Sequence, residues 1–282
     1  MSGTSQDISP QSPIGVFDSG LGGLTVVAEL AEALPGEDVV YLGDSARVPY
    51  GIKSLQTVRR FALEDAAFLM QQAPKLIVVA CNTASAAAVE ALEDACPVDV
   101  VDVIRPGAAA ALEATDRHIG VIATEATVAS GAYPRRIHEL DAGREVLSQA
   151  CPLLVPIVEE GRPQEDPIVL HVLCDYLRML QRRRPGALIL GCTHYPLLSG
   201  AIGKLMGPEV PLISSAAAAA GEVRRRLELR GLTNPRDSGG TLTCYTTDNP
   251  ERFSRLGERF GRRPIDRVER VGTDELETQP LT

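Results

Sequence analysis

Short apolar segments alternate with longer amphipathic or alanine-rich segments along most of the chain. The apolar segments predict strands, and the segments between them predict helices. Because the apolar segments lack polar alternation, they are typical of strands that are covered on both faces, and the alternation predicts an α/β fold with mainly parallel sheets. The predicted strands cover residues 13–17, 38–42, 76–80, 98–103, 119–122, 187–190 and 242–245, and the predicted helices cover 24–33, 55–72, 83–95, 129–140, 167–183 and 251–260, with a further helix after Pro196.

An internal repeat divides this pattern into two similar halves. The segment Ile14-Gly-Val16 recurs as Ile119-Gly-Val121, and in each half a later apolar strand ends at a cysteine, Cys81 or Cys192. We therefore predict two similar α/β domains related by a pseudo-two-fold, with the active site in the cleft between them.

The repeat also suggests where the domains begin and end. We expect a discontinuous first domain, residues 13–105 plus 216–272, and a second domain at 106–215, with the chain crossing over near Arg105-Pro-Gly107. The polar ends, residues 1–12 and 273–282, are predicted to be flexible tails.

Composition narrows the function classes. The 282 residues carry 28 Lys and Arg against 37 Asp and Glu, a net charge of −9, which disfavours direct binding to nucleic acid or to an anionic membrane. The N-terminal segment lacks the basic and apolar regions of a signal peptide, and no apolar run is long enough to span a membrane. We therefore expect a cytoplasmic protein whose six cysteines are reduced.

The two repeated cysteines are candidate reactive groups. Open α/β sheets bind ligands at the carboxyl ends of their strands, and a thiol at a helix N-terminus is expected to lose its proton more easily than a free thiol. If the halves face each other, Cys81 and Cys192 approach one cleft from opposite sides, so one can remove a proton from a carbon while the other returns one. A single cysteine after an apolar strand is more often a packing residue, and we interpret Cys96, Cys151, Cys174 and Cys244 in that way.

Polar residues accompany both cysteines. Asp18 ends the first strand and is followed by a glycine-rich turn, Ser19–Gly23, whose backbone N–H groups are suited to binding a carboxylate; the alternative is an ordinary strand–helix turn. His194 lies two residues after Cys192 and could assist that thiol or bind substrate, whereas the alternative is a structural histidine. The spacing supplies too few ligands for a zinc site, so no metal is predicted.

These segments together resemble the aspartate/glutamate racemase superfamily, and in particular glutamate racemases. The resemblance runs in order over about residues 14 to 260, so it is specific even though each motif alone is weak. His194 favours glutamate, since aspartate racemases of the superfamily tend to carry Glu at that position. The matching segments are Ile14–Val26, Gly43-Asp44, Pro49–Gly51, Val79–Ser85, Gly120–Thr124, Thr127-Val128, Val155–Glu159 and Leu190–Pro196.

The resemblance implies a reaction and a set of site residues. It implies racemisation of glutamate without any cofactor, with Cys81 and Cys192 as the two bases, and a D-glutamate product that feeds peptidoglycan synthesis. Asp18 would assist Cys81, and His194 would assist Cys192. The residues implied to bind the substrate are Asp18, Ser19, Tyr50, Gly51, Asn82, Thr83, Thr124, Glu159, Thr193 and His194.

Three alternatives remain beside this interpretation. The first is a superfamily enzyme acting on aspartate or another small acid. The second is a nicotinamide-dependent oxidoreductase, which is disfavoured because the third glycine of its G-x-G-x-x-G motif would fall at Thr25. The third is an additional binding role as an inhibitor of DNA gyrase, which some relatives have.

Pyridoxal phosphate is not expected, since Lys53, Lys75 and Lys204 lie in no suitable motif. Family members form dimers or monomers, and we expect a homodimer.

Overall fold

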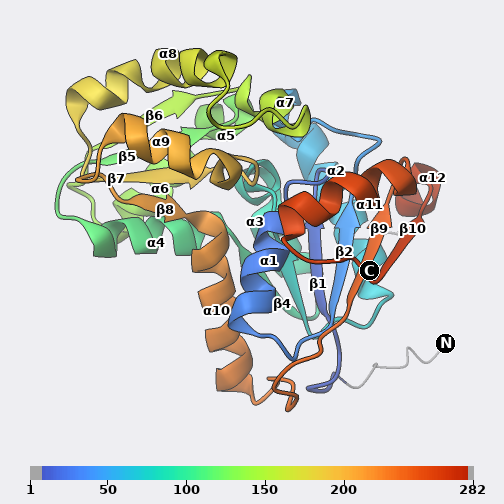
Figure 1. Cartoon of the computed structure of the whole chain (residues 1–282). Coiled ribbons are helices and arrows are strands. Elements are labelled where there is room, and N and C mark those ends of the chain that lie inside the picture. The colour runs from blue at the N-terminus through green and yellow to red at the C-terminus, as the bar shows by residue number, and fades with distance from the viewer. Residues whose placement is uncertain (1–7, 279–282) are drawn as a thin grey trace.

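The computed structural model describes residues 8–278 and contains two separate sheets (Figure 1). The first has six strands in the order β10-β9-β2-β1-β3-β4, and the second has four in the order β6-β5-β7-β8. The pairings within both described sheets are parallel, which confirms the predicted α/β class. The strands are β1 (Ile14–Asp18), β2 (Val39–Gly43), β3 (Leu76–Val79), β4 (Asp99–Asp102), β5 (Ile119–Ala123), β6 (Val146–Ala150), β7 (Ala187–Gly191), β8 (Leu212–Ser214), β9 (Leu242–Thr246) and β10 (Arg267–Arg270).

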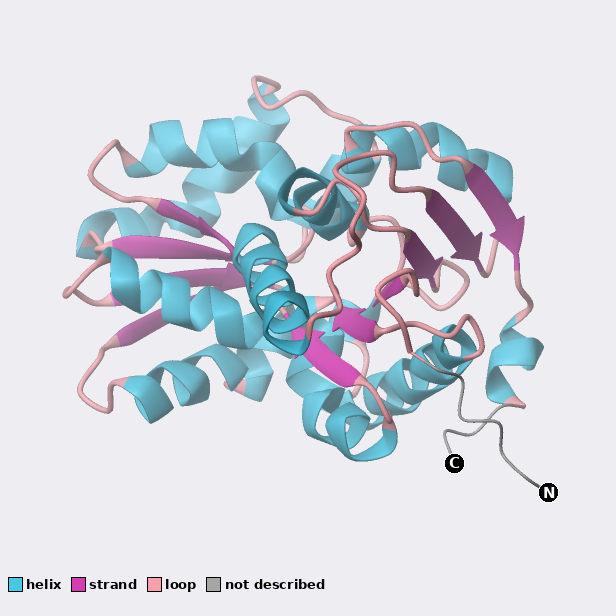
Figure 2. Cartoon of the chain, turned by 90° about the horizontal axis from the view of Figure 1, so that it is seen from below, coloured by secondary structure: helices cyan, strands magenta, loops and turns pink. Residues whose placement is uncertain are grey.

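Helices cover both faces of each sheet, as the view from below makes clear for the four-stranded one (Figure 2). The α-helices are α1 (Leu24–Ala33), α2 (Leu55–Met70), α3 (Asn82–Ala95), α4 (Ile104–Ala114), α5 (Glu125–Ser130), α6 (Ala132–Leu140), α7 (Leu154–Glu159), α8 (Pro167–Arg183), α9 (Ser199–Met206), α10 (Ser215–Arg230), α11 (Pro250–Gly261) and α12 (Thr273–Glu277), with short 3-10 helices η1 (Tyr50–Ile52) and η2 (Tyr195–Leu198). No helix within residues 8–278 is long and apolar enough to cross a membrane.

The strand orders confirm the internal repeat. The order β2-β1-β3-β4 in the first sheet is the same as β6-β5-β7-β8 in the second. The first strands of the two halves also have equivalent neighbours: Ile14 pairs with residues of β2 and β3, and Ile119 pairs with residues of β6 and β7. Cys81 and Cys192 therefore follow equivalent strands.

The repeated glycine of each half has the same packing role. A Cβ added to Gly15 would lie 3.2 Å from Pro74, and one added to Gly120 would lie 3.1 Å from Pro185. Each proline precedes the neighbouring strand of its sheet, so the glycine makes room for the chain that enters that strand. The recurring Ile-Gly-Val segment is thus a packing signal.

Two helices differ from the prediction. The chain passes from the first sheet to the second at Arg105-Pro-Gly107, as expected, but these residues lie in a helix that was not predicted, α4. The Oδ1 atom of Asp102 accepts hydrogen bonds from the N–H groups of Ile104 and Arg105, which starts the helix despite the proline. The single helix predicted at 129–140 is divided at Gly131, whose φ of +67° ends α5.

The chain order of the sheets agrees with a discontinuous first domain. Strands of the first sheet come from residues 14–102 and 242–270, and those of the second from 119–214. The helix α10 packs against both α1 and α4, so it contacts both halves. The domain boundaries at 105/106 and 215/216 stay predictions.

The structure describes part of each end of the chain that was predicted to be a flexible tail. The structure shows that residues 273–277 form α12, with Leu276 fully buried, whereas the sequence predicted a loose tail from residue 273. The polar composition concealed that single apolar anchor. At the other end the Pro10 carbonyl accepts a hydrogen bond of 2.7 Å from Lys75. Residues 1–7 and 279–282 lie outside the described residues.

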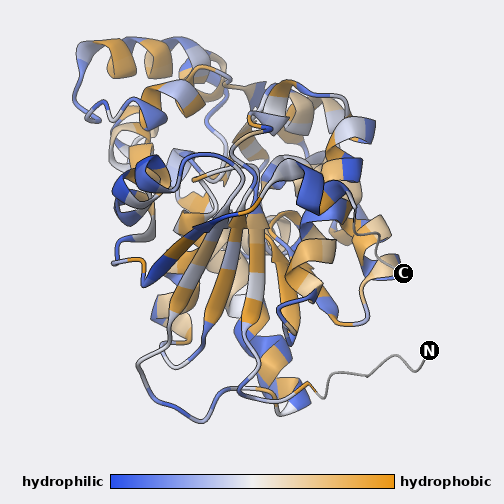
Figure 3. Cartoon of the chain, turned by 90° about the vertical axis from the view of Figure 1, so that its right-hand side faces the viewer, coloured by the Kyte–Doolittle hydropathy of each residue, from blue (hydrophilic) through white to orange (hydrophobic). Residues whose placement is uncertain are grey.

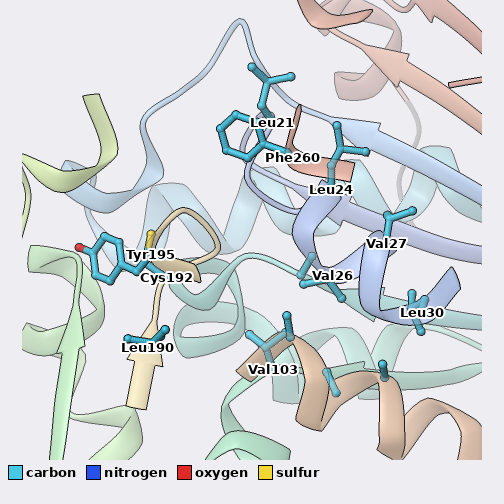
Figure 4. Packing of buried hydrophobic residues seen from close by; sticks show 14 of the residues in the cluster. Leu21, Leu24, Val26, Val27, Leu30, Val103, Leu190, Cys192, Tyr195 and Phe260 are labelled. Carbon is cyan, nitrogen blue, oxygen red and sulfur yellow. The ribbon is translucent and has the colours of Figure 1, made fainter. Parts of the chain in front are cut away.

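The core joins the two halves. Hydrophobic residues predominate along the strands of the first sheet (Figure 3). One cluster of buried residues runs from α1 through α10 and α11 to β7 and α8. Figure 4 shows part of it, with Leu24 and Val26 of α1 in the same cluster as Leu190 of β7 and Phe260 of α11. The two sheets are therefore held by shared apolar packing as well as by the chain connections.

Candidate active site

A cavity of about 400 Å³ lies between the two sheets, at the carboxyl ends of their strands. This is where parallel α/β sheets place their ligands. Every predicted site residue except Asp18 lines it. The lining residues that were predicted are Ser19, Tyr50, Gly51, Cys81, Asn82, Thr83, Thr124, Glu159, Cys192, Thr193 and His194.

Sequence reasoning missed the apolar part of the lining. Val48, Pro49 and Ile52 contribute from the segment after β2, and Pro152, Val155 and Pro156 contribute from α7 and the turn before it. Several of these residues lie within the motifs that carry the family resemblance, but prolines and aliphatic residues give no chemical signal in a sequence. Such an apolar wall lowers the local polarity, which strengthens electrostatic interactions beside it.

Cys81 is held at the start of α3 in the first half. It is the residue before the helix, and its sulfur accepts a hydrogen bond of 3.4 Å from the N–H group of Ala84. Its thiol also donates to Ser19 Oγ at 3.9 Å. Only 6% of Cys81 is exposed, so the thiol lies almost entirely inside the cavity wall.

The protonation of Cys81 differs from the prediction. The helix N-terminus was expected to lower its pKa, but burial and the negative charge of Asp18 together raise the pKa to about 12. The hydrogen bonds from Ala84 and with Ser19 offset this only in part. The cost of removing a thiolate from water is larger than the gain from the helix terminus. At neutral pH Cys81 is therefore a thiol that can donate a proton.

Asp18 lies directly behind the cavity wall. Its side chain is fully buried, and Oδ2 accepts a hydrogen bond of 3.1 Å from Gly20 N–H. Oδ1 is buried and has no hydrogen-bond partner among the described residues. Burial raises the pKa of Asp18, whereas the charge of His194 and the backbone N–H groups of the turn lower it. Asp18 thus influences the site through its charge, and it does not line the cavity.

The glycine-rich turn has a different role from the predicted one. Gly20, Gly22 and Gly23 do not line the cavity, so the turn presents no row of N–H groups to a ligand there. A Cβ on Gly22 would lie 2.2 Å from Thr193 Oγ1 and 2.6 Å from the His194 ring. The glycine therefore allows the first half to approach the Thr193-His194 segment of the second half closely. Thr25 reinforces this contact with a hydrogen bond of 2.9 Å to the Thr193 carbonyl.

Cys192 has an imidazole neighbour in the second half. Its sulfur lies 3.9 Å from His194 Nδ1, and Nε2 of the same ring lies 3.1 Å from Glu159 Oε1. Phe260 contacts the ring edge-on, with 5.4 Å between the ring centroids. Thiol, imidazole and carboxylate therefore form a chain in which each group orients the next.

The charges of this chain support one another. Burial on its own lowers the pKa of His194, but its contacts with Cys192 and Glu159 outweigh that effect and raise the pKa to about 10. The hydrogen bond from His194 in turn lowers the pKa of Glu159. At neutral pH the imidazole is therefore protonated, and its positive charge lies next to the sulfur of Cys192.

A buried ionic network fixes the segment that bears Tyr50 and Gly51. The Tyr50 hydroxyl lies within hydrogen-bond distance of Asp44 and, at 3.0 Å, of Asp65, and its single hydrogen can be donated to either carboxylate. Arg47 bonds to both carboxylates and to Glu64. Burial and the two nearby carboxylates raise the pKa of Tyr50, so its hydroxyl stays protonated. Tyr50 is thereby held in the wall, and its hydroxyl is already used inside the protein.

Threonine hydroxyls join the halves on the other side of the cavity. Thr83 Oγ1 lies 3.0 Å from Thr124 Oγ1 and 3.1 Å from Thr127 Oγ1, and the last two lie 2.9 Å apart. A Cβ on Gly51 would lie 2.8 Å from the Thr124 Cβ, so the glycine permits η1 to pack on Thr124. Each of these hydroxyls can donate its hydrogen to a bound ligand instead of to a neighbouring threonine.

Comparison with known proteins shows the family to which the chain belongs. The model of the Asp/Glu/hydantoin racemase family matches residues 14–223. A glutamate racemase of Thermus thermophilus is 51% identical over 267 residues, which cover 95% of this chain and 99% of that protein.

Solved structures give the same result. A glutamate racemase isoform of Bacillus anthracis superposes with a TM-score of 0.89 at 41% identity, covering 93% of this chain and 98% of that one. A glutamate racemase of Francisella tularensis, solved in complex with D-glutamate, superposes with a TM-score of 0.87 at 40% identity, covering 94% and 99%. The chain therefore belongs to the Asp/Glu/hydantoin racemase family and, within it, to the glutamate racemases.

Proposed function

We propose that this glutamate racemase uses Cys81 and Cys192 as its two bases and requires no cofactor. The observation that carries the proposal is their placement: both thiols line one cavity and follow equivalent strands of two sheets with the same strand order. Two bases on opposite sides of a bound substrate can invert its α-carbon without moving the substrate.

The proton transfers balance between the two sulfurs. In one direction the Cys192 thiolate takes the α-proton and becomes a thiol, while the thiol of Cys81 gives its proton to the opposite face of the carbon and becomes a thiolate. In the reverse direction Cys81 is the base and Cys192 the acid. The resting charges described above, a protonated Cys81 and an imidazolium beside Cys192, match the first of these states.

The difficult step is to stabilise the negative charge that develops at the α-carbon and its carboxylate. Hydrogen-bond donors in a dry cavity provide such stabilisation without reorganisation during the reaction. Donors in the lining include the Asn82 amide and the hydroxyl groups of Ser19, Thr83, Thr124 and Thr193. They come from both halves, so they surround a small dicarboxylate. Glu159 lines the cavity and supplies negative charge suited to an ammonium group, and Asp18 adds negative charge from behind the wall.

The proposed product, D-glutamate, is a precursor in cell-wall synthesis. D-glutamate released by this enzyme would supply peptidoglycan synthesis in the cytoplasm. Glutamate is preferred as substrate because His194 follows Cys192-Thr193, and because the Francisella tularensis relative is described in complex with D-glutamate.

Proton NMR tests this proposal directly. Purified protein is incubated in D2O with L-glutamate, and separately with L-aspartate, without added pyridoxal phosphate. We expect the α-proton signal of glutamate to disappear and that of aspartate to persist. The two-thiol mechanism is contradicted if a Cys81→Ser variant converts L-glutamate into D-glutamate at the wild-type rate.

A further inference from the structure

One buried donor in the cavity wall has no partner. Asn82 is the first residue of α3, directly after Cys81, and only 3% of it is exposed. Its side-chain Nδ2 is buried and makes no hydrogen bond to any described residue. An unsatisfied buried amide is costly, so such a group usually serves a ligand or a functional state.

The oxygen of the same amide is already engaged. Asn82 Oδ1 accepts a hydrogen bond of 2.7 Å from the hydroxyl of Tyr133, a residue of α6 in the second half of the molecule. With Oδ1 engaged by the phenol, Nδ2 is the amide atom that is left without a partner among the described residues. The bond therefore selects one of the two orientations that an asparagine amide can take.

Tyr133 is built into the fold so that it can make this bond. Its side chain is only 1% exposed and packs in the core of the second half with Ile104, Ala108 and Ile137. A Cβ added to Gly191 would lie 3.0 Å from the Tyr133 ring, so a glycine leaves the room that the ring occupies.

The chemical state of Tyr133 makes it a dependable donor. Burial raises its pKa above the ordinary value of a tyrosine, and the hydrogen bond with Ser215 offsets this only in part. A neutral phenol has a single hydrogen to donate, and here that hydrogen goes to Asn82.

We infer that Tyr133 is a positioning residue for substrate binding: it locks the Asn82 amide across the domain boundary so that Nδ2 donates to a carboxylate of the bound amino acid. Tyr133 itself does not line the cavity and touches no reacting atom. The inference rests on the proposed binding of glutamate in this cavity, and it adds a residue to which neither a sequence motif nor the cavity lining points.

The test compares Tyr133→Phe with the wild type in steady-state racemisation of L- and D-glutamate. Phenylalanine keeps the ring and removes only the hydroxyl. Because the contact acts through binding, we expect KM to rise about 3- to 10-fold while kcat stays within about 2-fold, the size of one lost hydrogen bond. An unchanged KM would overturn the inference.

A double-mutant cycle separates positioning from packing. If Tyr133 acts through Asn82, then Tyr133→Phe changes KM by less than about 2-fold in an Asn82→Ala background. If the two substitutions instead multiply, Tyr133 acts independently of Asn82 and the inference is wrong. Tyr195→Phe is a matched control, because its buried hydroxyl donates a bond of 2.8 Å to the Cys151 carbonyl and to no lining side chain. It should lower the melting temperature about as much as Tyr133→Phe without raising KM.

A second variant keeps the test decisive if Tyr133→Phe does not fold. Asn82→Asp can still accept the phenol hydrogen bond but offers no N–H2 group, so we expect KM to rise at least as much as in Asn82→Ala. A wild-type KM in Asn82→Asp would overturn the inference. Wild-type protein that does not racemise glutamate at all would instead count against the proposed function, so the two failures are distinguishable.

Discussion

The two halves of the molecule share a strand order but surround their cysteines with opposite chemistry. Cys81 has a buried carboxylate nearby, and its pKa rises to about 12. Cys192 has the imidazole of His194 at 3.9 Å, backed by Glu159. The repeated fold thus supplies two equivalent positions, whereas a few side chains near each cysteine give the two sulfurs different electrostatic surroundings.

The difference between the two cysteines cannot be seen in kcat/KM. The enantiomers of glutamate have equal free energies, so any substitution must change kcat/KM equally in the two directions. An asymmetry between the two sulfurs can therefore appear only in kcat and KM taken separately, or in the exchange of the α-proton with solvent. Experiments that compare the halves need those measurements.

The largest effect is expected from removing either sulfur. Cys81→Ser and Cys192→Ser should each lower racemisation by about 1000-fold or more, because a serine hydroxyl is a far weaker acid than a thiol. Each variant retains the sulfur on one side only. In D2O we expect residual α-proton exchange to favour one enantiomer of glutamate in Cys81→Ser and the other enantiomer in Cys192→Ser.

Cys174→Ser is the control for the cysteine variants, since Cys174 is exposed on α8 and lies outside the cavity. It should racemise glutamate at the wild-type rate. If both active-site variants retained exchange with the same enantiomer, the two sulfurs would not lie on opposite faces of the substrate.

Loss of the imidazole should have the next largest effect. His194→Asn removes the positive charge beside Cys192, the sulfur that we propose as one of the two bases, and we expect kcat to fall about 100-fold in both directions. The melting temperature shows whether the variant is folded, and the ultraviolet absorbance at neutral pH shows how much thiolate it contains. A folded variant with undiminished thiolate absorbance would show that His194 does not stabilise the Cys192 thiolate.

Weakening the imidazole without removing it sharpens the comparison. In Glu159→Gln the pKa of His194 should fall from about 10, because the carboxylate contributes to raising it. A raised histidine pKa stabilises the fold fully below its unfolded value of 6.5, and this stabilisation is lost as pH rises toward about 10. The lowered pKa of Glu159 adds stability that is present above 4.5 and lost in acid.

The wild type should therefore exceed Glu159→Gln in melting temperature most clearly between about pH 5 and 6.5, by about 2–4 °C. The difference should shrink toward pH 10 and toward strong acid. Scanning calorimetry of both proteins across this range provides the measurement, and a difference that is independent of pH would mean that the contact is not ionic.

The sequence predicted the architecture well because the repeat encodes it twice. Apolar strands without polar alternation and the recurring Ile-Gly-Val segment pointed to two parallel sheets, and both cysteines were found through their equivalent positions. The α4 start was missed because Pro106 and Gly107 are typical of loops, whereas here Asp102 satisfies the first N–H groups of the helix.

The protonation state of Cys81 and the role of the glycine-rich turn could not be predicted from the sequence. A helix N-terminus favours a thiolate, but the burial of Cys81 and the charge of Asp18 reverse that preference. The glycine-rich turn was interpreted as an anion site, whereas Gly22 makes room for Thr193 and His194 from the other half. Both results depend on contacts between segments more than 60 residues apart, which local patterns do not contain.

The smallest effect should come from neutralising the carboxylate beside Cys81. In Asp18→Asn the side-chain oxygen can still accept the Gly20 N–H, so the turn should persist while the negative charge is lost. Burial remains the main cause of the raised Cys81 pKa, so the pKa should fall from about 12 by about one unit or less. Thiolate absorbance titrations of Asp18→Asn, with and without Cys81→Ser, isolate this sulfur. An unchanged titration would assign the protonated state of Cys81 to burial alone, and the chemical difference between the halves would then depend only on His194 and Glu159.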